Sequence, residues 1–123
     1  MAHGEMGHFE IPADDAGRAK GFYSELFGWS FQETPGFEGY YMFRSGPGES
    51  GGAIGQRGVM SGQTMRQYVS VDSIDDALAR VPGLGGEVVE PKMEAAGMGF
   101  YAVVRDTEGG EIGLWQDTSQ GQG

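Results

Sequence analysis

The chain has 123 residues, no cysteine and a formal net charge of −10 at pH 7. This length predicts a single domain, residues 1–123, that buries a hydrophobic core without disulfides. The lack of cysteine excludes thiol catalysis and zinc-thiolate frameworks. Eight Lys and Arg against eighteen Asp and Glu disfavour a nucleic-acid partner, because phosphate binding needs clustered cations. With no apolar run of roughly 18 residues and no signal-peptide pattern, we expect no membrane partner and a cytoplasmic protein.

A short glycine-rich pattern occurs twice in the chain. Residues 51–55, GGAIG, recur 58 positions later as residues 109–113, GGEIG. The alternating segments 8–12 and 66–70 are separated by the same offset, and each leads into a helical pattern. This recurrence predicts two copies of one unit. We therefore expect module one at 1–58, a linker at about 59–64, module two at 65–117 and a mobile tail at 118–123.

The first module is predicted to fold as one strand, one helix and three strands. Residues 6–12 alternate like a strand, and Asp14 or Asp15 is placed to cap a helix that ends at Gly28. Residues 29–32, 40–44 and 53–56 predict three short strands. The helix should be amphipathic, with its apolar stripe toward the core. That stripe consists of Ala19, Phe22, Tyr23, Leu26 and Phe27.

The second module repeats this order. Residues 65–71 predict a strand, and Ser73 with Asp76 forms an approximate capping box before a helix. The stripe of that helix consists of Ile74, Ala77, Leu78 and Val81. Three more strands follow at 87–90, bounded by Pro91, then at 99–104 and 111–116.

Three segments together resemble the vicinal oxygen chelate superfamily, which includes glyoxalase I, bleomycin-resistance proteins and extradiol dioxygenases. They are HFEIPADD at 8–15, FYSELFGW at 22–29 and VRDTEGGEI at 104–112. The resemblance implies an α+β fold in which two β-α-β-β-β modules form a curled mixed sheet, a half-barrel around a cleft, with the helices outside. It also implies a homodimer, and exposed sheet edges would favour such association.

The resemblance also defines four positions at which relatives hold a metal ion. Through the 58-residue offset these positions are His8, Gly55, Arg66 and Gly113. Glycine offers no donor and arginine is a permanent cation, so only His8 could be a ligand. We therefore expect no metal and no other cofactor, with a divalent metal as the alternative.

Strand alternation places a polar set of side chains on the cleft face. Glu10 and Glu111 could clamp a cationic ligand or pair with arginines, and Tyr68 and Trp115 could stack on a planar ligand or fill space. No catalytic residue is assigned, and whether the protein is an enzyme stays open. The sequence predicts binding of a small organic molecule; the alternative is a metal-dependent lyase, isomerase or dioxygenase using His8 and nearby carboxylates. The predicted ligand-binding residues are His8, Glu10, Arg57, Arg66, Tyr68, Glu111 and Trp115.

Overall fold

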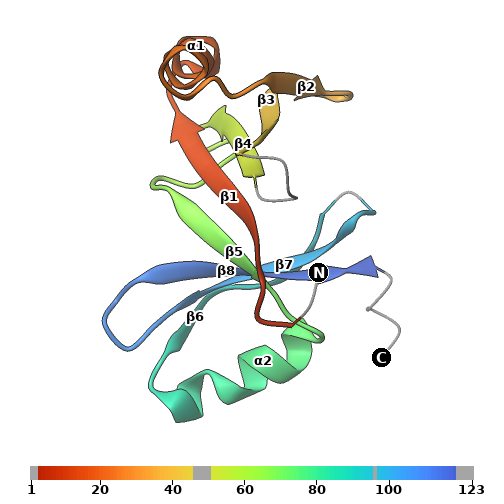
Figure 1. The fold of residues 1–123 in the computed structure, drawn as a ribbon. Helices are drawn as coiled ribbons and strands as arrows, with labels where there is room; N and C mark the ends of the chain where they lie inside the picture. Colours follow the sequence, from red (N-terminus) through yellow and green to blue (C-terminus); the bar gives the residue numbers. More distant parts are fainter. Residues whose placement is uncertain (1–2, 46–50, 96, 119–123) are drawn as a thin grey trace. The chain divides into compact units, whose positions relative to one another are not determined.

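The structure is a computed structural model that describes residues 3–45, 51–95 and 97–118, so the predicted tail at 118–123 lies outside the described residues except for its first residue. A strand, a helix and three strands follow one another twice, which confirms the α+β class and the repeated β-α-β-β-β order (Figure 1). The elements are β1 (Met6–Ala13), α1 (Ala16–Phe27), β2 (Phe31–Thr34), β3 (Phe37–Arg44), β4 (Gly51–Gln56), β5 (Arg66–Ser70), α2 (Ile74–Arg80), the 3-10 turn η1 (Pro82–Leu84), β6 (Glu87–Glu94), β7 (Gly99–Arg105) and β8 (Glu111–Asp117).

The chain divides into two compact units. One is Gly7–Arg66, and the other combines Met1–Met6 with Gln67–Gly123. In the first unit the strand order is β2-β3-β4-β1, and in the second it is β5-β8-β7-β6. Each is an open mixed sheet, because β1 with β4 and β5 with β8 are parallel pairs and the other pairs are antiparallel. No helix of the described chain is both long and apolar enough to cross a membrane.

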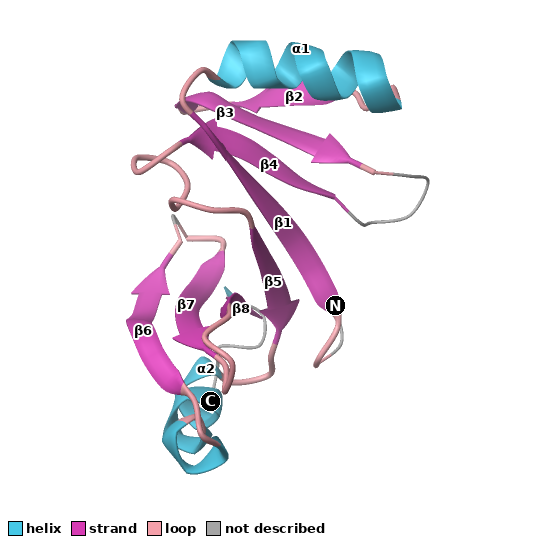
Figure 2. Cartoon of the chain, turned by 90° about the vertical axis from the view of Figure 1, so that its left-hand side faces the viewer, coloured by secondary structure: helices cyan, strands magenta, loops and turns pink. Residues whose placement is uncertain are grey.

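In the first unit, α1 lies across one face of its sheet (Figure 2). The helix begins as predicted, because the Asp15 carboxylate accepts a hydrogen bond from the Arg18 backbone N–H at 3.0 Å. It ends at Gly28, whose φ of 75° lies in the left-handed region that glycine tolerates. The core beneath it contains Ile11 and Ile54, which strand alternation places on this face.

The predicted apolar stripe of α1 is wrong for three of its five residues. Phe22, Leu26 and Phe27 remain 59%, 60% and 54% exposed. The predicted Ala19 and Tyr23 do pack against the core of this unit, together with Ala16. Beyond the end of the helix, Trp29 stacks on Phe43 with ring centroids 4.6 Å apart and on Tyr23 at 5.8 Å. The sheet side of the helix is therefore filled without its largest side chains.

In the second unit, α2 contacts β6, β7 and β8. Ser73 caps this helix as predicted, accepting from the Asp76 N–H at 3.1 Å. Ile74 is fully buried against Ala102 and Leu114. A side chain on β8 also holds the start of the helix, because the Gln116 Oε1 accepts from the Ile74 N–H at 2.7 Å. Gln116 is itself buried, so this hydrogen bond fixes α2 on its sheet.

Pro91 does not end the sixth strand, although the sequence predicts that it does. β6 runs from Glu87 to Glu94 through the proline. Two conditions allow this. β6 is the outer strand of its sheet, paired with β7, and its register shifts between Glu90 and Met93. A proline lacks the N–H that an inner strand would need, but an edge strand with an irregular register tolerates it.

The Gln116 hydrogen bond predicts the effect of one substitution. Gln116→Leu fills the buried site with an apolar side chain of similar size but leaves the Ile74 N–H without its acceptor. We expect a loss of about 1–3 kcal/mol in the free energy of unfolding, the usual cost of an unsatisfied buried donor. Urea unfolding followed by circular dichroism measures it, with the exposed variant Gln32→Leu as control. Equal stability of the two variants would contradict the role assigned to Gln116.

Candidate functional site

Four polar side chains meet on the sheet face of the first unit that is opposite α1. His8 and Glu10 lie two residues apart on β1, and Glu10 is in register with Ala53 of β4. Tyr40 comes from β3, and Ser61 from the turn that follows β4. We call this group, His8, Glu10, Tyr40 and Ser61, the Glu10 cluster.

The carboxylate of Glu10 is the centre of this cluster. Its Oε2 accepts a short hydrogen bond from the Tyr40 hydroxyl and another from the His8 Nε2 at 3.1 Å. Its Oε1 accepts from the Ser61 hydroxyl at 3.1 Å. Glu10 is only 8% exposed, so these three side chains replace the water that would otherwise solvate its charge.

The hydrogen bonds keep Glu10 ionised. Burial by itself raises the pKa of this carboxyl, but the hydrogen bonds from His8, Tyr40 and Ser61, together with the charge interaction with His8, outweigh burial and lower the pKa below its ordinary 4.5. An ionised carboxylate can only accept hydrogen bonds. The His8 Nε2 must therefore carry a proton in this contact, which fixes the tautomer of the neutral ring.

The glycine at the end of β4 is covered by the same cluster. A Cβ at Gly55 would lie 2.9 Å from the Ser61 Oγ and 3.0 Å from the Tyr40 ring. The Cβ of Met60 would also lie 3.0 Å away, so a side chain at this position would require its neighbours to shift. Two of the three neighbours, Ser61 and Tyr40, are residues that bind Glu10.

The two arginines of the predicted site lie in the same unit. Arg57 pairs with Asp14, its Nε donating at 3.0 Å, and also donates to the Gln63 carbonyl. The Arg66 guanidinium lies over Gly62, so that a Cβ there would be 3.0 Å from its Nη2. Neither arginine is a partner of Glu10, whose hydrogen bonds come from the rest of its cluster.

The other three predicted residues belong to the second unit. Tyr68 is buried, and its ring lies so close over Gly113 that a Cβ at Gly113 would overlap it. The Trp115 ring lies over Gly99, while its Nε1 donates to Asp117 at 2.7 Å. Glu111 accepts from Arg105 at 3.2 Å.

The residues at the positions where the resemblance implies a metal do not fit a metal ion. Gly55 and Gly113 have no donor, and each faces an aromatic ring where a ligating side chain would stand. In the part of the chain that the structure describes, no three His, Asp or Glu side chains gather as a metal site would require. His8 and Glu10 are two such donors, and they are hydrogen-bonded to each other.

Two members of the Glu10 cluster are absent from the residues predicted from sequence. Tyr40 could have been found by alternation, since Tyr41 is in register with Ile54, which leaves Tyr40 on the opposite face. Ser61 lies in the segment predicted to be a linker. Its position depends on a turn in which the Gln56 carbonyl accepts from three following N–H groups, and no sequence pattern shows this.

Comparisons with known proteins agree with this fold. Residues 6–46 match the family model for bleomycin resistance protein-like N-terminal domains. A Mycobacterium tuberculosis protein named "Putative glyoxylase CFP32" is 30% identical over 87% of this chain. The anthracycline biosynthesis protein DnrV of Streptomyces peucetius is 28% identical over 94% of this chain. This chain spans 43% and 48% of the lengths of these two relatives.

A solved structure shares the fold at lower sequence identity. A glyoxalase/bleomycin resistance protein/dioxygenase superfamily member from Vibrio splendidus 12B01 superposes with a TM-score of 0.61. The match covers 89% of this chain and 96% of the other, at 14% identity. A sequence identity this low supports a shared fold and says nothing about a shared function.

The close contact of Tyr68 with Gly113 predicts the cost of one methyl group. Gly113→Ala should lose about 1–3 kcal/mol of unfolding free energy, because the added Cβ overlaps a buried ring. Gly83→Ala is the matched control, since a Cβ there meets nothing within 4 Å. In Tyr68→Ala, the further loss from Gly113→Ala should largely disappear. An equal loss with and without the Tyr68 ring would contradict this account.

The lowered pKa of Glu10 predicts an acid-dependent stability. Because the folded-state pKa lies below the unfolded value, the ionised carboxylate stabilises the protein fully above about pH 4.5. That contribution is lost as the pH falls through the folded-state pKa. Glu10→Gln should be less stable than wild type by about 1–3 kcal/mol at pH 7, and the difference should shrink below pH 4.5.

Urea unfolding between pH 7 and pH 3 measures this difference. The exposed carboxylate of Glu38 supplies the control Glu38→Gln. A wild-type advantage over Glu10→Gln that stays constant down to pH 3 would refute a stabilising role for the ionised Glu10.

Proposed function

Because this chain belongs to the vicinal oxygen chelate superfamily of glyoxalase- and bleomycin-resistance-like proteins, we propose that it binds a small planar organic molecule at the Glu10 cluster without a divalent metal. The observation that carries the proposal is the arrangement of donors around Glu10. A metal ion at His8 and Glu10 would have to displace hydrogen bonds from His8 and Tyr40. It would gain no third protein donor from the glycine at position 55.

The same arrangement favours a planar ligand over a purely cationic one. Both oxygens of Glu10 accept hydrogen bonds within the protein, and the carboxylate is buried. It therefore offers little to an incoming cation. The His8 side chain is 28% exposed and presents an aromatic surface beside that carboxylate. The similarity to DnrV, a protein named for anthracycline biosynthesis, supports ligands with a flat ring system.

The dimer expected from sequence is part of this proposal. A homodimer is consistent with the acidic surface only if the contact itself is not dominated by repulsion between like charges. A contact surface that carries both positive and negative side chains would meet this condition.

A metal-dependent lyase, isomerase or dioxygenase is the second candidate. The name of the mycobacterial relative favours it, and His8 and Glu10 are the two neighbouring donors that it would use once their mutual hydrogen bond is broken. Binding of a metal would require neutral imidazole and ionised carboxylate together. One tightly held ion per chain, lost in His8→Ala, would establish this candidate in place of the metal-free one.

Ligand binding is tested by thermal shift with paired panels of neutral and cationic planar aromatics, in chelator-treated protein. A neutral planar compound at about 100 times its Kd should stabilise wild type by about 2.7 kcal/mol, which raises Tm by about 10 °C. His8→Ala should abolish the shift. His3→Ala is the matched control, because His3 is exposed and contacts Asp72 instead.

Two outcomes would contradict the proposal. If no member of either panel shifts Tm, the cluster does not bind planar molecules. If the shift survives in His8→Ala, the molecule binds elsewhere.

A further inference from the structure

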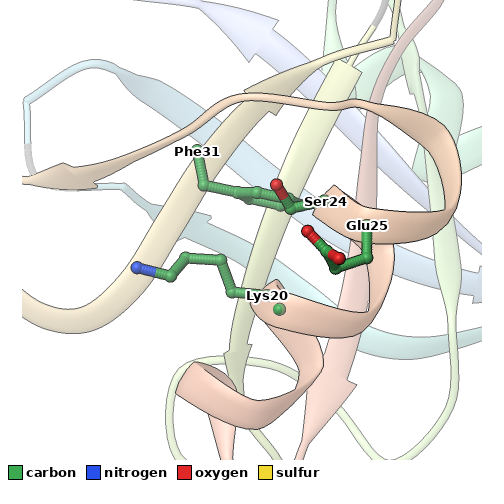
Figure 3. A pocket seen from close by; sticks show the side chains of 5 residues that line it. Lys20, Ser24, Glu25 and Phe31 are labelled. Atoms are coloured by element: carbon green, nitrogen blue, oxygen red, sulfur yellow. The ribbon is translucent and has the colours of Figure 1, made fainter.

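The depression between α1 and β2 is lined by side chains that water reaches. They are Lys20, Ser24 and Glu25 of the helix and Phe31 of the strand (Figure 3). None of these four side chains is buried, so water and salt screen the two charges among them. The Glu10 cluster differs, because it holds a buried carboxylate in contact with an imidazole. A buried titratable group with a specific partner is the better candidate for chemistry.

Two neighbours place the proton of the His8 ring on Nε2. The Nε2 atom lies 3.1 Å from the Glu10 Oε2, and an ionised carboxylate can only accept a hydrogen bond. The Nε2 atom also lies 3.2 Å from the Tyr40 hydroxyl, whose own proton is donated to Glu10, so that this oxygen can only accept from the ring. In the neutral ring Nδ1 therefore has no proton and carries a basic lone pair.

The pair of His8 and Glu10 has the arrangement of a carboxylate-assisted general base. A carboxylate that accepts from one ring nitrogen fixes the tautomer of the ring, and its charge balances the positive charge that the ring gains when the other nitrogen takes a proton. Glu10 suits this task because three side chains hold its carboxylate in place. The His8 side chain is 28% exposed and the Glu10 side chain 11%, so a bound molecule would meet the imidazole rather than the carboxylate.

The hydroxyl groups of the cluster are not arranged as nucleophiles. The Ser61 Oγ donates to the Glu10 Oε1 at 3.1 Å, and the Tyr40 hydroxyl donates to Oε2. A hydroxyl nucleophile needs a ring nitrogen that accepts its proton. The ring nitrogen in this cluster, Nε2 of His8, is itself a donor. The reaction that the pair supports is therefore proton transfer to or from the bound molecule.

We propose that His8, positioned by Glu10, is a metal-free general base that removes a proton from the carbon next to the carbonyl group of a planar ketone. The Nδ1 lone pair takes the proton, the C–H electron pair forms the carbon–carbon double bond of an enolate, and the carbonyl π electrons move to oxygen. Return of a proton from the ring to the same carbon gives exchange, and return to a conjugated carbon gives an isomer. This inference rests on the proposed function, because it needs a planar molecule at the Glu10 cluster.

A planar ketone suits both the site and the reaction. When the carbonyl group is fused to an aromatic ring system, its enolate is conjugated with that system and stays flat. A site that accepts the planar ketone therefore accepts the enolate as well, and no change of shape opposes the proton transfer.

Hydrogen exchange tests the base, with 2-indanone as a neutral planar ketone and chelator-treated protein in D₂O. Proton NMR should show that wild type accelerates the loss of the hydrogens next to the carbonyl group. His8→Gln should lower the catalysed rate by about 100-fold or more, because an amide takes up no proton at neutral pH. This variant keeps a flat side chain that can donate to Glu10, so 2-indanone should still raise its Tm. His3→Ala is the matched control and should exchange like wild type, because His3 contacts Asp72 instead.

Glu10→Gln tests the positioning role of the carboxylate. Nitrogen-15 NMR of the His8 ring should show the proton on Nε2 in wild type. The variant should show a mixture of the two tautomers, because an amide can accept through its oxygen or donate through its nitrogen. The catalysed exchange should fall by about tenfold or more, while 2-indanone should still raise the Tm of the variant. A loss of exchange with an unchanged tautomer would contradict positioning by Glu10.

Four results would overturn the inference. If 2-indanone raises the Tm of wild type but does not exchange, His8 is not a base, and the proposed binding still stands. If neither a Tm shift nor exchange is seen, the base is refuted and the proposed binding of planar molecules is contradicted as well. Exchange that survives in His8→Gln would assign the base to another group. Exchange that requires an added metal ion would establish the metal-dependent candidate instead.

Discussion

A carboxylate buried in a protein must be matched by hydrogen-bond donors, and Glu10 shows how this requirement organises one sheet face. Two strands and one turn of the first unit each contribute one hydrogen-bond donor to Glu10. The donors are His8 from β1, Tyr40 from β3 and Ser61 from the turn after β4. Removing any one donor would leave part of a buried charge unsatisfied. The positions of these three side chains are therefore determined by Glu10.

The arrangement of groups around Glu10 differs from the arrangement of groups in a metal site. In a metal site, ligands from several strands converge on a cation. Here the convergent groups are donors, and the group at their centre is an anion. In the first unit the Tyr40 ring lies close to the place where a Cβ of Gly55 would stand, and in the second unit the Tyr68 ring covers the same place at Gly113.

Much of the architecture could be predicted from the sequence, because its local signals act over short distances. The caps at Asp15, Gly28 and Ser73 each depend on one residue and its nearest neighbours. The repeat of the glycine pattern predicted the two copies of the β-α-β-β-β order. Pairing partners across the chain are harder to predict. Ser61 reaches Glu10 from 51 positions away through an irregular turn, and periodicity carries no information about such turns.

The apolar stripe of α1 shows a different limit of sequence reasoning. Helical periodicity correctly identified the helix, but it assigned Phe22, Leu26 and Phe27 to the buried face together with Ala19 and Tyr23. Ala16, Ala19 and Tyr23 pack on the sheet, while Phe22 and Leu26 point outward. When a helix has apolar residues on two faces, the shape of the sheet surface beneath it decides which face is buried. The sequence does not reveal that shape.

The most direct test of the central claim is a carbon-13 NMR titration of the Glu10 carboxyl, with and without saturating Zn²⁺. The account predicts a pKa below 4.5, because three side-chain donors stabilise the ionised form, and the same titration curve when Zn²⁺ is present. A pKa at or above 4.5, or a curve displaced by Zn²⁺, would contradict it, since Glu10 would then be either poorly matched by donors or available as a metal ligand.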